Sequence, residues 1–168
     1  MRWIWIDKFT RFDSGTRAVA VKCCSASEDH VHDLYPNFPI VPNSLLIESM
    51  AQTAGILVGE SRQFKEKVIL AKIGKASFSR VVRPGDLVEF DATVLQLNEM
   101  GASIEGVIRL LSNGIGQPES PVVAQIELMF SHIDNNIAGM KFPEHNFVFT
   151  GHFTQLLDEF RNKPEPTY

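Results

Sequence analysis

Two polar side chains, Glu48 and Gln52, stand inside the most apolar stretch of this 168-residue chain. Residues four apart in a helix lie on the same stripe of its surface, so these side chains are expected to be neighbours. Burying a carboxylate in apolar surroundings costs free energy unless it is paired. We therefore expect Glu48 either to have a polar partner or to take part in a reaction. Proton transfer in acid–base catalysis is one such task. Capping the helix or pairing with a buried polar group is the structural alternative.

The stretch that carries this pair is predicted to be a helix enclosed by protein. Apolar residues at 45–58 cover nearly its whole circumference, and three prolines within 36–42 keep the preceding chain extended. Asn43 or Ser44 is expected to cap the helix. Its length of about 21 Å is too short to cross a bilayer, so no membrane span is expected.

The segments around this helix alternate between apolar and polar residues, which predicts strands. The aromatic run at 3–6 and the turn at 12–15 indicate a hairpin with the first of these strands. Successive strands joined by hairpins favour a mostly antiparallel sheet. The predicted strands are 17–24, 68–73, 76–82 after a bend at Gly74, 87–97, 103–111 and 122–130.

One apolar helix and one long sheet indicate an α+β fold in which the sheet wraps around the helix. We expect one domain at residues 1–133 and a C-terminal extension at 134–168 that packs on or beside it. Within the extension, residues 153–160 are predicted to form a short amphipathic helix that covers the core.

The composition narrows the class of protein. The net charge of −4 and the pI near 5.7 argue against nucleic acid as the main partner, because no basic stripe exists to hold phosphate. The two cysteines, Cys23 and Cys24, are adjacent, which suggests neither a disulfide framework nor a zinc site. The apolar run at the N-terminus is too short for a signal peptide and is broken by Asp7, so the cytoplasm is the expected location.

Two motifs carry a resemblance to a known family. The run YPNFPIVPNSLLIESMAQ at 35–52 resembles the signature of the hot-dog-fold 3-hydroxyacyl-[acyl-carrier-protein] dehydratases of fatty-acid synthesis, which reads approximately HFPGxPxxPGxLxxEAxAQ. The run ILAKIGKASFSRVVRPGDLVEF at 69–90 is similar to the strand that follows the helix in that family, with its PGD turn. The resemblance covers roughly residues 3–133 and implies a hot-dog fold, a long antiparallel sheet around one central helix.

The resemblance implies a reaction that removes water from a 3-hydroxyacyl thioester, without a cofactor or a metal. It places the catalytic carboxylate at Glu48, the backbone N–H that holds the enolate oxygen at Asn43, and the glutamine at Gln52. The residues expected to bind the substrate are Leu34, Tyr35, Pro36, Ile40, Ser44, Gln52 and Phe78. A tunnel for the acyl chain is expected to be lined by Ile56, Phe78, Val81 and Phe90.

The chain departs from the family at the catalytic base, because the histidine of the signature falls on Leu34. Leucine cannot take a proton. His32, two residues upstream and about 6.5 Å away in an extended chain, is the substitute base that we consider, and a solvated loop histidine is its structural alternative. Further histidines without motif support are His30, His132, His145 and His152. His30 and His32 could bind a metal with the neighbouring aspartates, but a third ligand at a convincing spacing is missing.

The family relationship also implies partners: an acyl thioester on acyl carrier protein, and a second subunit joined edge to edge into a homodimer. A trimer of dimers is a further assembly that the resemblance allows. Two other functions stay open, namely a non-catalytic acyl-thioester binder or partner subunit of an active paralogue, and an acyl thioesterase. A basic patch for the acidic carrier is expected from Lys72, Lys75, Arg80 and Arg83.

Overall fold

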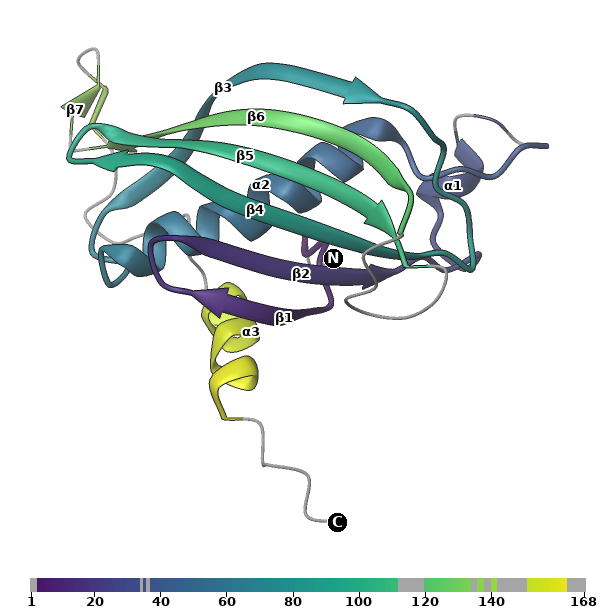
Figure 1. Cartoon of the computed structure of the whole chain (residues 1–168), viewed down its shortest axis with the longest axis horizontal. Coiled ribbons are helices and arrows are strands. Elements are labelled where there is room, and N and C mark those ends of the chain that lie inside the picture. The colour runs from purple at the N-terminus through teal and green to yellow at the C-terminus, as the bar shows by residue number, and fades with distance from the viewer. Residues whose placement is uncertain are drawn as a thin grey trace.

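A computed structural model describes residues 3–33, 35, 37–111, 120–133, 136–137, 140–141 and 151–162. Six antiparallel strands form one sheet in the order β1-β2-β4-β5-β6-β3, and two short strands pair separately (Figure 1). The elements are β1 (Lys8–Asp13), β2 (Arg17–Cys23), α1 (His30–Asp33), α2 (Asn43–Ser61), β3 (Lys67–Phe78), β4 (Leu87–Asn98), β5 (Gly101–Leu110), β6 (Val122–Ile133), β7 (Asn136–Ile137), β8 (Met140–Lys141) and α3 (Gly151–Arg161).

The long sheet curves around α2, which lies against its concave face (Figure 1). This arrangement confirms the predicted α+β hot-dog fold. Close packing of helix and sheet depends on Gly106 in β5, since a Cβ at this position would lie 2.7 Å from Sδ of the buried Met50. Helix residues from Met50 to Gly59 are buried, as the apolar circumference predicted. None of the helices in the described ranges is both long and apolar enough to cross a membrane.

The start of α2 differs from the prediction. Pro42 is the N-cap residue, and its carbonyl oxygen accepts hydrogen bonds from the N–H groups of Leu45 (2.9 Å) and Leu46 (3.3 Å). No side-chain cap is formed, so the expectation that Asn43 or Ser44 caps the helix is wrong; both side chains are exposed. Proline suits this place because its fixed φ fits the helix start and its missing N–H is not needed there.

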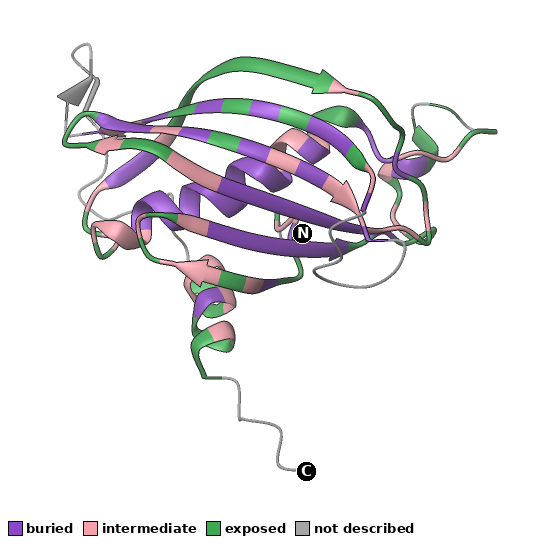
Figure 2. Cartoon of the chain, viewed as in Figure 1, coloured by how far each residue is buried: buried purple, intermediate pink, exposed green. Residues whose placement is uncertain are grey.

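The third strand also differs from the prediction, because β3 is one strand and not two. It continues through Gly74, and irregularities in its pairing with β6 between Leu70 and Lys72 and between Ile73 and Lys75 absorb the expected bend. The strand stops at Phe78, so the predicted extension to residue 82 is wrong. As an edge strand, β3 is exposed over most of its length, whereas β2 and the first half of β4 are largely buried (Figure 2).

The first and last segments that the structure describes, residues 3–7 and α3, each place a residue beside α2, namely Trp3 and Phe153. Residues 3–7 precede β1 and are not part of a strand, contrary to the expected start of the hairpin. The C-terminal helix α3 contains the predicted amphipathic segment and buries Leu157, while Arg161 forms an ion pair with Glu60 of α2. His145 lies outside the described residues.

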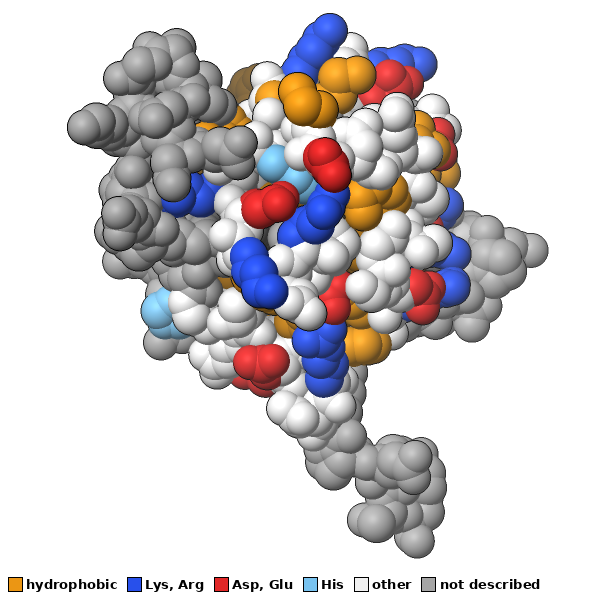
Figure 3. All heavy atoms as spheres, turned by 90° about the vertical axis from the view of Figure 1, so that its left-hand side faces the viewer, with side chains coloured by type: hydrophobic (Ala, Val, Ile, Leu, Met, Phe, Trp, Pro, Cys, Tyr) orange, Lys and Arg blue, Asp and Glu red, His pale blue; other side chains and the backbone are white. Residues whose placement is uncertain are grey.

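Acidic and basic side chains are mixed on the end of the molecule that lies near the carboxyl end of α2. Basic and acidic side chains intermingle there among uncharged atoms (Figure 3). On the outer face of the sheet, buried Asp91 accepts hydrogen bonds of 2.8 and 2.7 Å from Arg17 and one of 3.1 Å from Arg109. Bidentate pairing compensates the cost of burying this carboxylate on a strand.

Candidate active site

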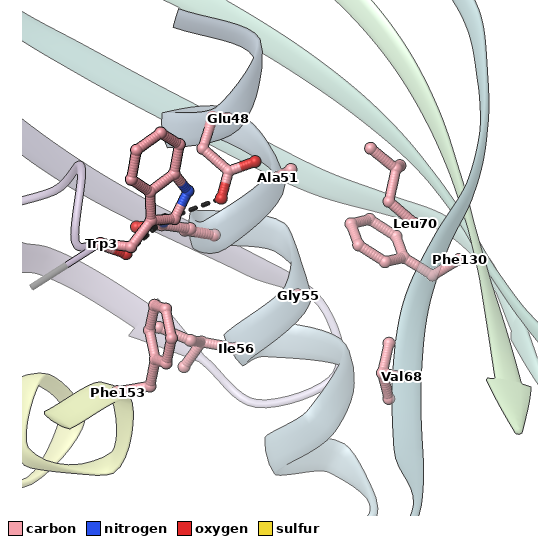
Figure 4. A pocket seen from close by; sticks show the side chains of 10 residues that line it. Trp3, Glu48, Ala51, Gly55, Ile56, Val68, Leu70, Phe130 and Phe153 are labelled. Atoms are coloured by element: carbon pink, nitrogen blue, oxygen red, sulfur yellow. Dashed lines mark hydrogen bonds between the residues drawn. The ribbon is translucent and has the colours of Figure 1, made fainter. Parts of the chain in front are cut away.

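A cavity of about 290 Å³ runs along the side of α2 that carries Glu48. Residues of α2 at helical spacing form its base, from Glu48 through Gly55 to Ile56. Trp3 and Phe153 lie on one side of the helix, and side chains of β3 and β6 lie on the other (Figure 4). The lining residues are Trp3, Glu48, Ala51, Gln52, Gly55, Ile56, Val68, Leu70, Phe130 and Phe153. The cavity is therefore apolar except at the end where Glu48 and Gln52 lie.

The two polar residues of the lining are hydrogen-bonded to each other. Gln52 Nε2 donates to Glu48 Oε1 at 2.8 Å and to the carbonyl oxygen of Trp3 at 3.1 Å. In turn, Gln52 Oε1 accepts a hydrogen bond of 2.8 Å from the N–H of Trp5. Gln52 is 6% exposed and Glu48 is half-buried. The amide thus fixes one oxygen of the carboxylate, and no residue that the structure describes hydrogen-bonds its other oxygen.

The first turn of α2 presents unpaired N–H groups. The N–H of Asn43 forms no hydrogen bond with any described residue, as is usual for the first turn of a helix. These groups carry the positive end of the helix dipole. Five residues separate Asn43 from Glu48, which corresponds to about 7.5 Å along the helix axis. Such a donor can hold an oxygen that develops negative charge.

The structure does not bring the considered substitute base into the cavity. His32 is exposed on α1, its Nε2 lies 2.9 Å from the carbonyl oxygen of Ala26, and it is absent from the described lining. Leu34 and Pro36 lie outside the described residues. Tyr35 is described and is 55% exposed.

Of the residues expected to bind substrate, Gln52 lines the cavity, whereas Ile40, Ser44 and Phe78 are not part of its described lining. Ile40 and Phe78 are half-buried, and Ser44 is exposed. Of the residues expected in a tunnel, Ile56 lines the cavity, Phe90 is buried in the core and Val81 is exposed. Sequence reasoning missed Trp3, Leu70, Phe130 and Phe153. The signal for Phe153 was available, since the amphipathic pattern of α3 predicted that its apolar face covers other residues.

Two further histidines, His30 and His132, are half-buried away from the described lining of the cavity. The ring of His30 lies edge-on to Trp5 with 4.9 Å between the ring centroids, and burial lowers the pKa of His30. Next to it, Lys22 Nζ is bonded to Glu28 Oε1 at 2.6 Å. His132 is at the far end of β6, where Nδ1 lies 2.8 Å from Glu66 Oε2. In the described ranges, no three His, Cys, Asp or Glu side chains are grouped so that they could hold a metal ion.

The fold and the cavity define a class, the hot-dog proteins with a carboxylate on the central helix. A family model described as a FabA-like domain matches residues 3–113, and the chain belongs to this family.

Curated relatives agree with this assignment. The chain is 32% identical over 137 residues to the 3-hydroxyacyl-[acyl-carrier-protein] dehydratase FabZ of Chloroflexus aggregans, a match that covers 79% of this chain and 87% of the relative. It is 30% identical over 129 residues to the enzyme of the same name from Caldanaerobacter subterraneus, with 76% and 86% covered. The resemblance to 3-hydroxyacyl thioester dehydratases therefore extends over most of both chains.

Solved structures share the fold. The dehydratase heterocomplex ApeI:P from Xenorhabdus doucetiae has a TM-score of 0.62 at 15% identity, and the match covers 95% of this chain and 90% of that chain. The E. coli PaaI protein has a TM-score of 0.58 at 15% identity, with 77% and 80% covered. At such identities the likeness concerns the fold alone, and hot-dog folds host several reactions on thioesters.

Proposed function

We propose that this chain binds 3-hydroxyacyl thioesters, carried by acyl carrier protein, and takes part in their dehydration. The observation that carries the proposal is the position of Glu48 at the polar end of an apolar cavity, with one carboxylate oxygen held by Gln52. An apolar cavity with a few convergent polar groups suits an aliphatic chain with a reactive head. The family relationship supplies the reaction class.

In the proposed reaction, a base removes the proton from the carbon next to the thioester carbonyl. The carbonyl oxygen becomes an enolate oxygen, which the N–H of Asn43 stabilises. Glu48 gives its proton to the 3-hydroxyl group, which leaves as water, and the electron pair of the broken C–H bond forms the double bond of the trans-2-enoyl thioester. The proton on the base then returns to Glu48 by way of solvent.

This reaction needs a base that the chain does not supply at the usual position, because Leu34 occupies the histidine position of the signature. His32 is a poor substitute because its Nε2 already contacts a backbone carbonyl and its side chain is exposed. We therefore propose that a related chain that carries this histidine supplies the base to Glu48, in a mixed dimer joined in the same way as the homodimer of this chain. The dehydratase heterocomplex from Xenorhabdus doucetiae is a precedent for a dehydratase that contains different chains.

The second subunit is proposed to join at β3. This strand is an edge of the sheet, and its Leu70 and Ile73 are exposed. A long exposed edge with apolar side chains readily pairs with another strand.

Light scattering of the purified chain should give the mass of a homodimer, and Ile73→Asp should give monomers. Leu95→Asp is the matched control, because Leu95 is exposed on the inner strand β4. A wild-type chain that is monomeric at all concentrations would overturn this arrangement.

The direct test of the proposed function incubates the purified chain with a 3-hydroxyacyl thioester while binding and the enoyl product are followed. We expect binding and slow dehydration, and Glu48→Gln should abolish the dehydration with binding retained. Glu105→Gln on β5 is the control, because Glu105 is exposed and lies outside the cavity. His32→Ala should change nothing. Absence of binding would refute the proposal, and release of free thiol in place of enoyl product would identify a thioesterase.

A non-catalytic acyl-thioester binder is the second candidate, and the observation that favours it is Leu34. A non-catalytic binder predicts tight binding and no enoyl product from any variant.

A cytoplasmic location is part of the first proposal. Its support is that Cys23 and Cys24 are both free thiols, as is usual in a reducing compartment.

A further inference from the structure

Part of one wall of the cavity comes from outside the region that the family model matches. Phe153 belongs to α3, whereas the family model ends at residue 113. Its ring nevertheless lines the same cavity as Glu48. Together with Trp3 it forms the wall on one side of α2, so residues from the two ends of the chain build this wall (Figure 4).

Phe153 lies at the end of the cavity remote from the polar residues. The lining residues of α2 extend from Glu48 to Ile56, which is about 12 Å along the helix axis. Figure 4 shows the ring of Phe153 beside Ile56, and Trp3 on the side of Glu48. An acyl chain with its head at Glu48 would therefore run along Ala51 and Gly55 toward the ring of Phe153.

The helix that carries Phe153 is anchored to the core. Leu157, one turn further along the same stripe, is 1% exposed. Arg161 in the last turn pairs with Glu60, whose other carboxylate oxygen accepts a hydrogen bond of 2.6 Å from Ser14. With α3 fixed at both of these points, the ring of Phe153 has a defined position and cannot swing away without loss of burial.

We propose that Phe153 sets the length of the acyl chain that the cavity accepts, by closing the end remote from Glu48. This inference rests on the proposed function, because it takes the ligand to be an acyl thioester. A rigid aromatic ring at the end of an apolar cavity excludes longer chains, and a chain that stops short leaves the apolar wall uncovered. One methylene more or less in such a pocket changes recognition about 10- to 200-fold.

The test measures binding, so that it does not depend on turnover. Dissociation constants are determined by calorimetry for a series of 3-hydroxyacyl-pantetheine thioesters of increasing chain length, with the wild-type chain, Phe153→Ala and Phe153→Trp. Phe153→Ala should shift the preferred chain to greater length and weaken the shortest binders several-fold. Phe153→Trp should shift the preference to shorter chains, and it keeps the apolar face of α3 intact if the alanine variant does not fold.

Phe160→Ala is the matched control. Phe160 lies on the same helix and packs against the core but is not part of the cavity lining, so its truncation should lower stability without a change in length preference. If Phe153→Trp and Phe153→Ala bind the same lengths as the wild type, Phe153 does not close the cavity and the inference is wrong, while the proposed function stands. If the wild-type chain binds no thioester of the series, the proposed function fails and this inference fails with it.

Discussion

Gln52 Nε2 donates a hydrogen bond of 2.8 Å to Glu48 Oε1, and the same amide is bonded to the backbone of Trp3 and Trp5. The carboxylate at the polar end of the cavity is therefore held by a residue that also fixes the N-terminal segment on α2. Since Trp3 itself lines the cavity, the Gln52 side chain holds both the Glu48 carboxylate and part of the cavity wall around it.

Replacement of Gln52 should lower the stability of the fold. Gln52→Met keeps the volume but leaves the N–H of Trp5 without its acceptor, and a buried group left unsatisfied costs about 1–3 kcal/mol. We expect a loss of this size in the free energy of unfolding, measured by urea denaturation. Gln96→Met is the control, because Gln96 is exposed on β4 and its replacement should stay within about 0.5 kcal/mol. Equal effects of the two substitutions would show that the Gln52 hydrogen bonds contribute nothing.

Binding of the carrier protein should depend on exposed basic residues after β3. Arg80 and Arg83 are exposed, and the guanidinium of Arg83 lies 4.6 Å from the ring centroid of Phe38. Arg80→Glu with Arg83→Glu should weaken the binding of an acyl carrier protein, most strongly at low salt. The same reversal of charge at Lys8 and Arg11, exposed on the opposite edge strand β1, is the control. If both pairs weaken binding equally, net charge and not a local patch attracts the carrier.

The stability of the fold should decrease as the pH falls through the ordinary histidine range. Burial lowers the pKa of His30 below its ordinary value of 6.5, and the nearby Glu28 opposes this in part. Below pH 6.5 the unfolded chain takes up a proton that the folded chain resists, so the free energy of unfolding falls. His30→Phe keeps a ring against Trp5 and should flatten this dependence between about pH 7.5 and 5.5, whereas His152→Phe on exposed α3 should not. An unchanged slope in His30→Phe would contradict the assignment.

The two adjacent thiols should differ in reactivity. Cys23 is exposed, whereas Cys24 is buried and burial raises its pKa to about 12. Because the thiolate is the reactive form, only Cys23 should react with a disulfide reagent in the native chain, and both should react in denaturant. Cys23→Ser should therefore remove the native reaction, and Cys24→Ser should leave it intact. Two fast-reacting thiols in the folded chain would show that Cys24 is accessible.

The sequence predicted the fold well because local patterns determine most of it. The apolar circumference of α2 and the alternation in β4, β5 and β6 each depend on neighbouring residues and were recognised correctly. The start of α2 was missed because Pro42 caps it through its backbone, without a side-chain signal. A pairing irregularity lies at Gly74, where the bend was expected, but the strand is not divided there because β3 stays paired with β6 on both sides.

The cavity was less predictable than the fold. Glu48 and Gln52 could be paired from their spacing, but Trp3 and Phe153 reach α2 from opposite ends of the chain. The amphipathic pattern of α3 predicted that Phe153 covers other residues, but no local pattern shows which residues these are. The position of His32 could not be judged either. The expected distance between His32 and position 34 assumed an extended chain. His32 instead belongs to a short helix, and its ring points toward the carbonyl oxygen of Ala26.

The central claim is that Glu48 is a competent catalytic acid that lacks a base at position 34. The most direct test measures the rate of enoyl-thioester formation by the wild-type chain, Leu34→His, and Leu34→His combined with Glu48→Ala. General acid–base groups contribute about 10² to 10⁴ in rate, so even an imperfectly placed histidine should raise dehydration by at least about tenfold, and Glu48→Ala should abolish the gain. If the wild-type chain dehydrates as fast as Leu34→His, or if the gain survives the loss of Glu48, the claim is contradicted.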